Sequence, residues 1–169
     1  VGSGVYVWGS IITVFMLSLS LGYLLGGRLS VNNPSLQRFA AIFALGAVLL
    51  YPLILFAEPV MEFIFLRIED PRYGSLMASA FLFILPTVIL GMISPYSVRL
   101  LVTKVEESGQ VAGTLYFVST LGSAIGTLMT SFYFILWFEV NTVLTLLTVV
   151  LLVVAGVAML AARRSSKSR

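Results

Sequence analysis

No charged residue occurs from Val111 to Phe138, and this long apolar stretch sets the class of fold. A helix rises about 1.5 Å per residue, so roughly 20 apolar residues cross a hydrocarbon layer about 30 Å thick. Only 10% of all residues are charged, whereas a globular domain carries roughly 25%. A chain this apolar cannot cover itself with a polar surface, and we therefore predict a membrane protein.

Small residues recur three or four positions apart along this stretch, on one side of the predicted helix. They are Ser119, Gly122, Ser123, Gly126, Thr127 and Thr130. In lipid no hydrophobic force drives helices together, and small residues let their backbones approach closely. We therefore predict that the other spans pack on this helix. A second face of this kind, with Ser18, Gly22 and Gly26 four apart, lies in the first span.

Hydropathy divides the chain into five predicted transmembrane spans. They cover residues 5–27, 39–57, 76–101, 111–138 and 143–162. Residues 59–69 mix apolar and charged side chains and are too few to cross a bilayer, which predicts a short interfacial helix. No linker separates the spans, so we expect one all-α helix bundle over residues 1–162 and a mobile basic tail over residues 163–169.

Two local sequences are expected to shape the spans. Asn33 is the predicted N-cap of the second span, with Pro34 in its first turn. The third span contains Pro86, Gly91 and Pro95. An interior proline removes a backbone donor and clashes with the preceding turn, so we predict a kink in this span.

The positions of Lys and Arg predict how the chain lies in the membrane. Eight of the ten fall on one side, namely Arg28, Arg38, Arg99, Lys104, Arg163, Arg164, Lys167 and Arg169. Only Arg67 and Arg72 fall on the other. Short cytoplasmic loops are enriched in Lys and Arg, so we expect a cytoplasmic C-terminus in the plasma membrane. Val1 then lies outside, and we expect another helix before it.

Reactive groups are scarce in this sequence. The chain has no Cys and no His, which removes thiol nucleophiles, thiolate metal sites and histidine-based acid–base catalysis. No span carries a charge at mid-depth, the usual sign of an ion-coupled transporter. We therefore assign no catalytic residue, no metal site and no cofactor, and we expect no binding of nucleic acid.

Four charged residues are candidate contacts with a cation or a partner. Glu58, Glu62 and Glu139 lie on the predicted outer side, where an acidic surface attracts polycations. Arg99 lies near the inner end of the third span, within reach of an anionic lipid or a cytoplasmic partner. Solvated loops and helix ends are the simpler interpretation of all four.

Three stretches resemble the membrane-embedded spermidine synthase-like proteins, in which a helical membrane domain precedes a cytoplasmic aminopropyltransferase. They cover residues 3–30, 85–101 and 109–135, under half of the chain. The third is the most specific, with Gly113, Tyr116, Ser119 to Ser123, Gly126 and Thr127 in that spacing. The resemblance implies a fold loosely similar to half of a major-facilitator transporter. It also implies a role in anchoring or regulating a polyamine-making enzyme, or in moving polyamines.

The chain departs from that family in ways that limit the inference. Residues 30–33 replace an acidic–basic pair, and the nucleotide-binding and polyamine-binding residues of the synthase are absent. Aminopropyltransferase activity is therefore expected only with a synthase domain attached or associated at the C-terminus. Two alternatives stay open, a small stand-alone transporter acting as a homodimer and a structural protein that assembles with another membrane protein.

Overall fold

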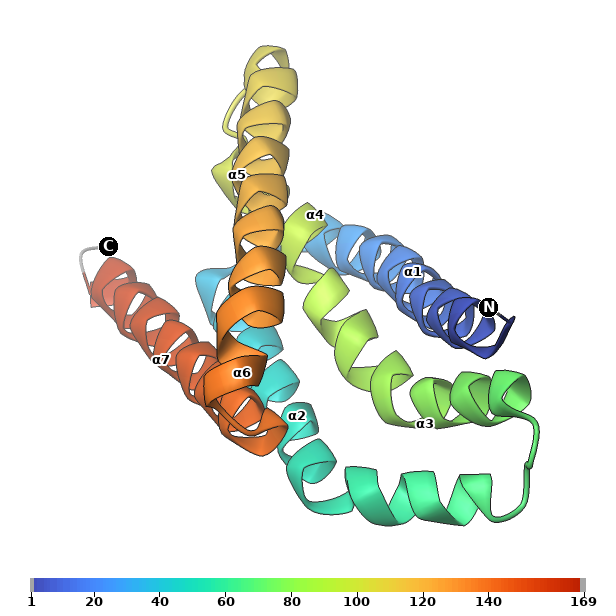
Figure 1. Ribbon diagram of the computed structural model, residues 1–169. Coiled ribbons are helices and arrows are strands. Elements are labelled where there is room, and N and C mark those ends of the chain that lie inside the picture. Colours follow the sequence, from blue (N-terminus) through green and yellow to red (C-terminus); the bar gives the residue numbers. More distant parts are fainter. Residues whose placement is uncertain (1, 168–169) are drawn as a thin grey trace.

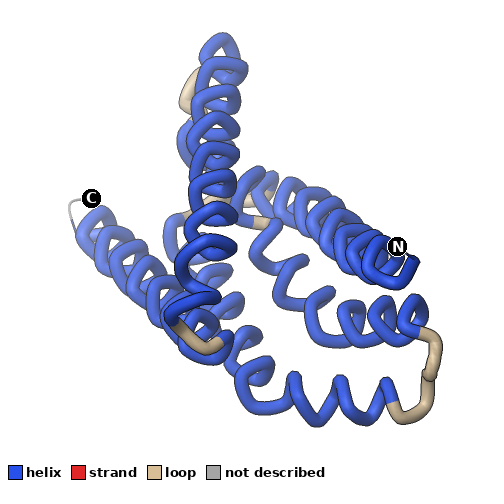
Figure 2. The backbone as a smooth tube through the Cα atoms, in the orientation of Figure 1, coloured by secondary structure: helices blue, strands red, loops and turns tan. Residues whose placement is uncertain are grey.

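The computed structural model describes residues 2–167, and every regular element in them is a helix (Figure 1). The long helices are α1 (Gly2–Val31), α2 (Leu36–Phe65), α3 (Pro71–Gly91), α4 (Ile93–Leu101), α5 (Ser108–Met129) and α7 (Val140–Lys167). Three short elements are the 3-10 turn η1 (Val105–Glu107), the π-helix η2 (Thr130–Phe134) and α6 (Ile135–Trp137). Figure 2 shows short loops between them. The all-α prediction is confirmed.

Five segments within the described residues are long and apolar enough to cross a membrane. They are Gly4–Val31, Leu36–Phe65, Pro71–Leu101, Val105–Trp137 and Val140–Arg164. In a hydrocarbon layer, a helix satisfies every interior backbone group within itself, which suits such segments to spanning. The protein is therefore a membrane protein with five candidate spans.

Three helix contacts are the most extensive in the described residues. α3 packs against α1 and against α2, and α7 packs against α2. One buried cluster joins α2 to α7 through Ala47, Leu50, Leu53 and Leu151. A second joins α2 to α4 around Ile42, Met92 and Tyr96. The packed order is α1, α3, α2 and α7, and α5 stands apart from it (Figure 1).

The contact of α1 with α3 is a seam of residues spaced four apart. Val14, Ser18, Gly22, Gly26 and Ser30 are all buried, and most of the residues between them are exposed. A spacing of four keeps residues on one helix face. Ser18 donates to the Val14 carbonyl at 2.6 Å and Ser30 to the Gly27 carbonyl at 2.7 Å, so both hydroxyls are satisfied inside the seam.

The predicted interfacial helix is not a separate element. α2 continues through Pro52 and Pro59 to Phe65, and residues 66–70 form the turn before α3. A proline inside a helix removes a single hydrogen bond, and the packed helix bends rather than ends (Figure 1). The 30 residues of α2 extend about 45 Å, longer than a hydrocarbon layer of about 30 Å.

The predicted N-cap of the second span is wrong by two residues. Ser35 caps α2, because its side chain accepts a hydrogen bond from the backbone N–H of Arg38 at 3.2 Å. Asn33 instead has a φ of 50°, in the left-handed region, while an N-cap needs an extended backbone. Asn33 therefore makes the turn, and Ser35 starts the helix.

The third span is interrupted at Met92, within the predicted kink. Gly91 ends α3 and Ile93 begins α4, so the interruption follows Gly91. Pro95 is the third residue of α4, where a backbone N–H would have no acceptor within that helix. Pro86 lies inside α3 and does not end it.

The predicted basic tail begins within a helix. α7 continues through Arg163 and Arg164 to Lys167, so this part of the predicted basic tail is helical. Arg169 lies outside the described residues.

Candidate functional site

The backbones of two helices come very close where α1 crosses the interruption between α3 and α4. A Cβ added to Gly26 would lie 2.6 Å from the Met92 Cα, and one added to Gly22 would lie 2.9 Å from the Gly91 Cα. The Gly22 position is closer still to the carbonyl oxygen of Val88. Only a residue without a side chain fits such distances. Gly22 and Gly26 thus occupy a helix contact, as their spacing indicates.

Tyr96 fixes the start of α2 to α4 and was not singled out by the sequence. Its side chain is fully buried and stacks on Phe39, with ring centroids 5.9 Å apart. Its hydroxyl accepts the backbone N–H of Ser35 at 3.0 Å and donates to the Ser35 carbonyl at 3.3 Å. A tyrosine in an apolar span needs a partner for its hydroxyl, and that need was the available signal.

α5, the helix expected to organise the bundle, packs against the helix α4 that precedes it in the chain. It does not pack against α1, α2, α3 or α7. No residue of α5 is buried, and the segment Val105–Trp137 has no buried position in its most apolar window. A Cβ added to Gly122 or Gly126 would meet nothing within 4 Å. The prediction that the other spans of this chain pack on the face of Ser119, Gly122, Ser123 and Gly126 is therefore wrong.

The prediction failed because only one of the two small-residue faces packs against another helix of this chain. The α1 seam meets Gly91 of α3, so small residues oppose each other there. In α5 the corresponding glycines, Gly122 and Gly126, have no neighbour within 4 Å of an added Cβ, and Ser119, Ser123 and Thr127 are exposed. The same local pattern thus marks a filled contact in α1 and an open surface in α5.

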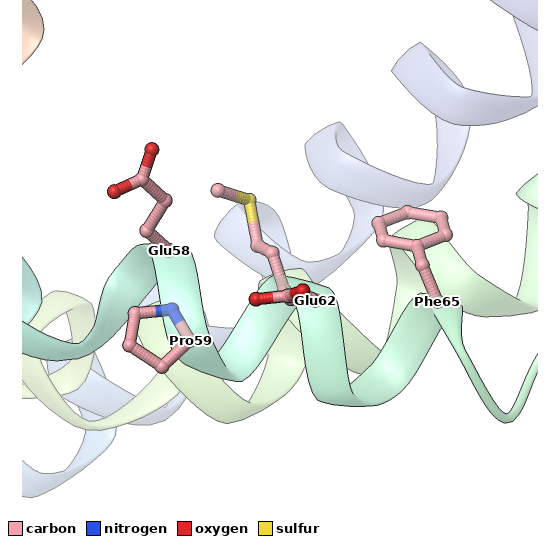
Figure 3. A pocket seen from close by; sticks show the side chains of 5 residues that line it. Glu58, Pro59, Glu62 and Phe65 are labelled. Carbon is pink, nitrogen blue, oxygen red and sulfur yellow. The ribbon is translucent and has the colours of Figure 1, made fainter.

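The four charged candidates are brought together only in part. Glu58 and Glu62 line an open hollow with Pro59, Met61 and Phe65, all from the last turns of α2 (Figure 3). Glu139 lies in the turn between α6 and α7 and is exposed. Arg99 lies one turn after Tyr96, near the start of α2, so it is at the other end of that helix from Glu58.

The hollow at Glu58 and Glu62 is a surface rather than an enclosed site. One helix supplies all five lining residues, and Figure 3 shows Glu58 extending away from the ribbon into open space. A binding site for a small cation needs groups that converge from several directions. Two exposed carboxylates on adjacent turns supply charge and no such convergence.

Charged residues at this end of the bundle serve the packing of α1 on α3. The guanidinium carbon of Arg72 lies 3.8 Å from the ring centroid of Tyr6, and the Ser10 hydroxyl donates to the Arg72 carbonyl at 3.4 Å. Asp70 caps α3 by accepting the Arg72 backbone N–H at 2.9 Å, with Pro71 next in the first turn. These contacts tie the start of α3 to α1.

The part of the chain that the structure describes was searched for groups that could hold a metal ion. Among residues 2–167 no three His, Cys, Asp or Glu side chains lie close enough together to hold a metal ion. Searches of protein-family models, curated proteins and solved structures found no match to this chain.

Proposed function

We propose that this chain is the membrane-embedded domain of a larger assembly, in which α5 packs against a transmembrane helix of a partner. The observation that carries the proposal is that α5 has no buried residue, beside four spans that pack on one another. Exposing α5 to lipid costs little free energy, because acyl chains are as apolar as the exposed Leu and Phe side chains. The exposed helix also presents a surface of glycines and hydroxyls that a second helix can approach closely.

The chemistry of that surface favours a helix rather than lipid as its cover. A row from Ser119 through Gly122 to Gly126 leaves a shallow groove along α5, and neighbouring helices fill such grooves well. The exposed hydroxyls add donors for hydrogen bonds between helices, each worth about 0.6 kcal/mol on average in membrane proteins. The assembly therefore gains both van der Waals contact and hydrogen bonds on this face.

The proposed partner carries a cytoplasmic aminopropyltransferase, which this domain anchors or regulates. The support is the resemblance to spermidine synthase-like proteins, whose three stretches cover α1, the end of α3 with α4, and α5. The first two stretches contain Gly22, Gly26 and Gly91, which form the tight backbone contact. The concentration of Lys and Arg supports a cytoplasmic location for the end of α7, on the side where such an enzyme lies.

Copurification tests the two parts of this proposal separately. The protein is isolated from its native membranes in a mild detergent, and the eluate is assayed for transfer of an aminopropyl group to putrescine. We expect this activity to copurify with the chain. A stable complex without the activity would contradict the enzymatic part, and a chain that elutes alone would contradict the assembly part.

A matched pair of variants assigns the complex to α5. Gly122→Leu fills the groove on the open face, and Gly156→Leu makes the same change on α7, where a Cβ also meets nothing within 4 Å. Gly122→Leu should lower the yield of complex at least tenfold, whereas Gly156→Leu should leave it unchanged. Equal yields for the two variants would place the partner elsewhere.

A further inference from the structure

An apolar hollow lies between α2 and α3, where each helix contains a proline. Leu49, Pro52 and Leu53 line it from α2, and Phe81, Leu82 and Pro86 line it from α3. Its volume is about 360 Å³. That is near the lower end of the roughly 300–1,000 Å³ typical of ligand pockets.

The hollow has a closed floor and an open mouth. Leu53 and Leu82 at its base are only 5% and 8% exposed, while Phe81 and Leu85 at its rim are 74% and 57% exposed. Both helices bend along their length in Figure 1, and Pro52 and Pro86 lie inside them. The proline rings are short, so they leave space that longer side chains would fill.

Neither water nor a protein helix suits this space. Every lining side chain is a hydrocarbon, and a bound water needs about two to four polar partners. A helix with its side chains is about 10–12 Å across, too wide for a hollow of this volume. An empty hollow would lose the dispersion contacts of its whole lining.

We propose that one acyl chain of a bilayer lipid occupies this hollow and exchanges slowly with the surrounding lipid. The mouth opens between exposed apolar residues of two membrane-spanning segments, so acyl chains are the molecules that reach it. A flexible chain of methylene groups is narrow enough to enter and meets the walls of α2 and α3 as well as the floor. A chain lying on a single exposed helix has contacts on one side only, which is why it exchanges faster.

Quenching of tryptophan fluorescence by brominated lipid measures that exchange. The two native tryptophans are first replaced in the full chain by Trp8→Phe and Trp137→Phe. Phe81→Trp then places a reporter at the mouth, and Tyr51→Trp places a matched one on an exposed α2 position outside the lining. Nanodiscs of brominated phosphatidylcholine are mixed with excess vesicles of unbrominated phosphatidylcholine. Fluorescence of the Phe81→Trp reporter should recover at least tenfold more slowly than that of the Tyr51→Trp reporter. Equal recovery rates for the two reporters would overturn the proposal.

A filling variant tests whether the slow exchange comes from the hollow itself. Leu49→Phe, in the Phe81→Trp background, adds volume inside the lining, whereas Leu55→Phe makes the same change at an exposed α2 position outside it. Leu49→Phe should bring recovery to the rate of Tyr51→Trp, and Leu55→Phe should leave it slow. Slow recovery in both variants, with helix content unchanged by circular dichroism, would overturn the assignment of the acyl chain to this hollow.

Discussion

Gly26 of α1 lies so close to Met92 that a Cβ on the glycine would be 2.6 Å from the Met92 Cα. The neighbouring Gly27 has nothing within 4 Å of the same added atom. These two adjacent glycines share the same local sequence, but only Gly26 lies against another helix segment. Close backbone contact of this kind is a main source of stability between membrane helices.

This difference predicts opposite effects of alanine at the two positions. Gly26→Ala should destabilise the fold by roughly 1–3 kcal/mol, because the backbone at Met92 has to move. Gly27→Ala should be neutral or stabilise the fold by up to about 1 kcal/mol, as alanine favours a helix. Unfolding of both variants in mixed detergent micelles measures the difference, and equal stabilities would contradict the close contact.

The two hydrogen bonds between the Tyr96 hydroxyl and the Ser35 backbone give a second prediction. Tyr96→Phe keeps the ring on Phe39 and removes both hydrogen bonds to the Ser35 backbone. The Ser35 carbonyl retains the Phe39 N–H, while the Ser35 N–H loses its Tyr96 acceptor. This hydrogen bond is part-buried, and an unsatisfied donor there costs about 1 kcal/mol. Tyr133→Phe is the matched control, since Tyr133 is 57% exposed.

The same unfolding measurement checks the tyrosine pair. We expect a clear loss of stability for Tyr96→Phe and none for Tyr133→Phe. Hydrogen exchange at the start of α2 should also rise in Tyr96→Phe, because Ser35 caps that helix. Unchanged exchange there would mean that α4 does not hold the start of α2.

The orientation of the chain is predicted by its loops and is testable with single cysteines. The natural chain has none, so a cysteine introduced anywhere is unique. Glu69→Cys, between α2 and α3, should react in intact cells with a maleimide that cannot cross the membrane. Lys104→Cys, between α4 and α5, should react only after lysis, because the side rich in Lys and Arg faces the cytoplasm. The reverse pattern would contradict the proposed cytoplasmic enzyme.

The sequence was sufficient for the fold class and for the approximate positions of the long apolar helices. Length and apolar character alone determine where a helix crosses a bilayer, and these are local properties. The ends were less accurate, as α2 shows by continuing through Pro59 to Phe65. Whether a proline ends a helix or bends it depends on the contacts of the following turns, which a local pattern does not contain.

The packing partners could not be predicted, because contact is a relation between two faces. The row containing Gly22 and the row containing Gly122 look alike in the sequence. Only the first meets an opposing glycine, at Gly91 of α3. Tyr96 was missed for the same reason, since its importance depends on Ser35, which is distant in the sequence.

Photo-crosslinking from Ser123 in native membranes tests the central claim most directly. A benzophenone amino acid at this exposed α5 position should form an adduct with another membrane protein, identified by mass spectrometry. The same group at the exposed Leu160 of α7 should give mainly lipid adducts. An adduct with a transmembrane helix that belongs to an aminopropyltransferase is the result we predict. An adduct between two copies of this chain would contradict that partner, and lipid adducts alone at Ser123 would contradict the docking role of α5.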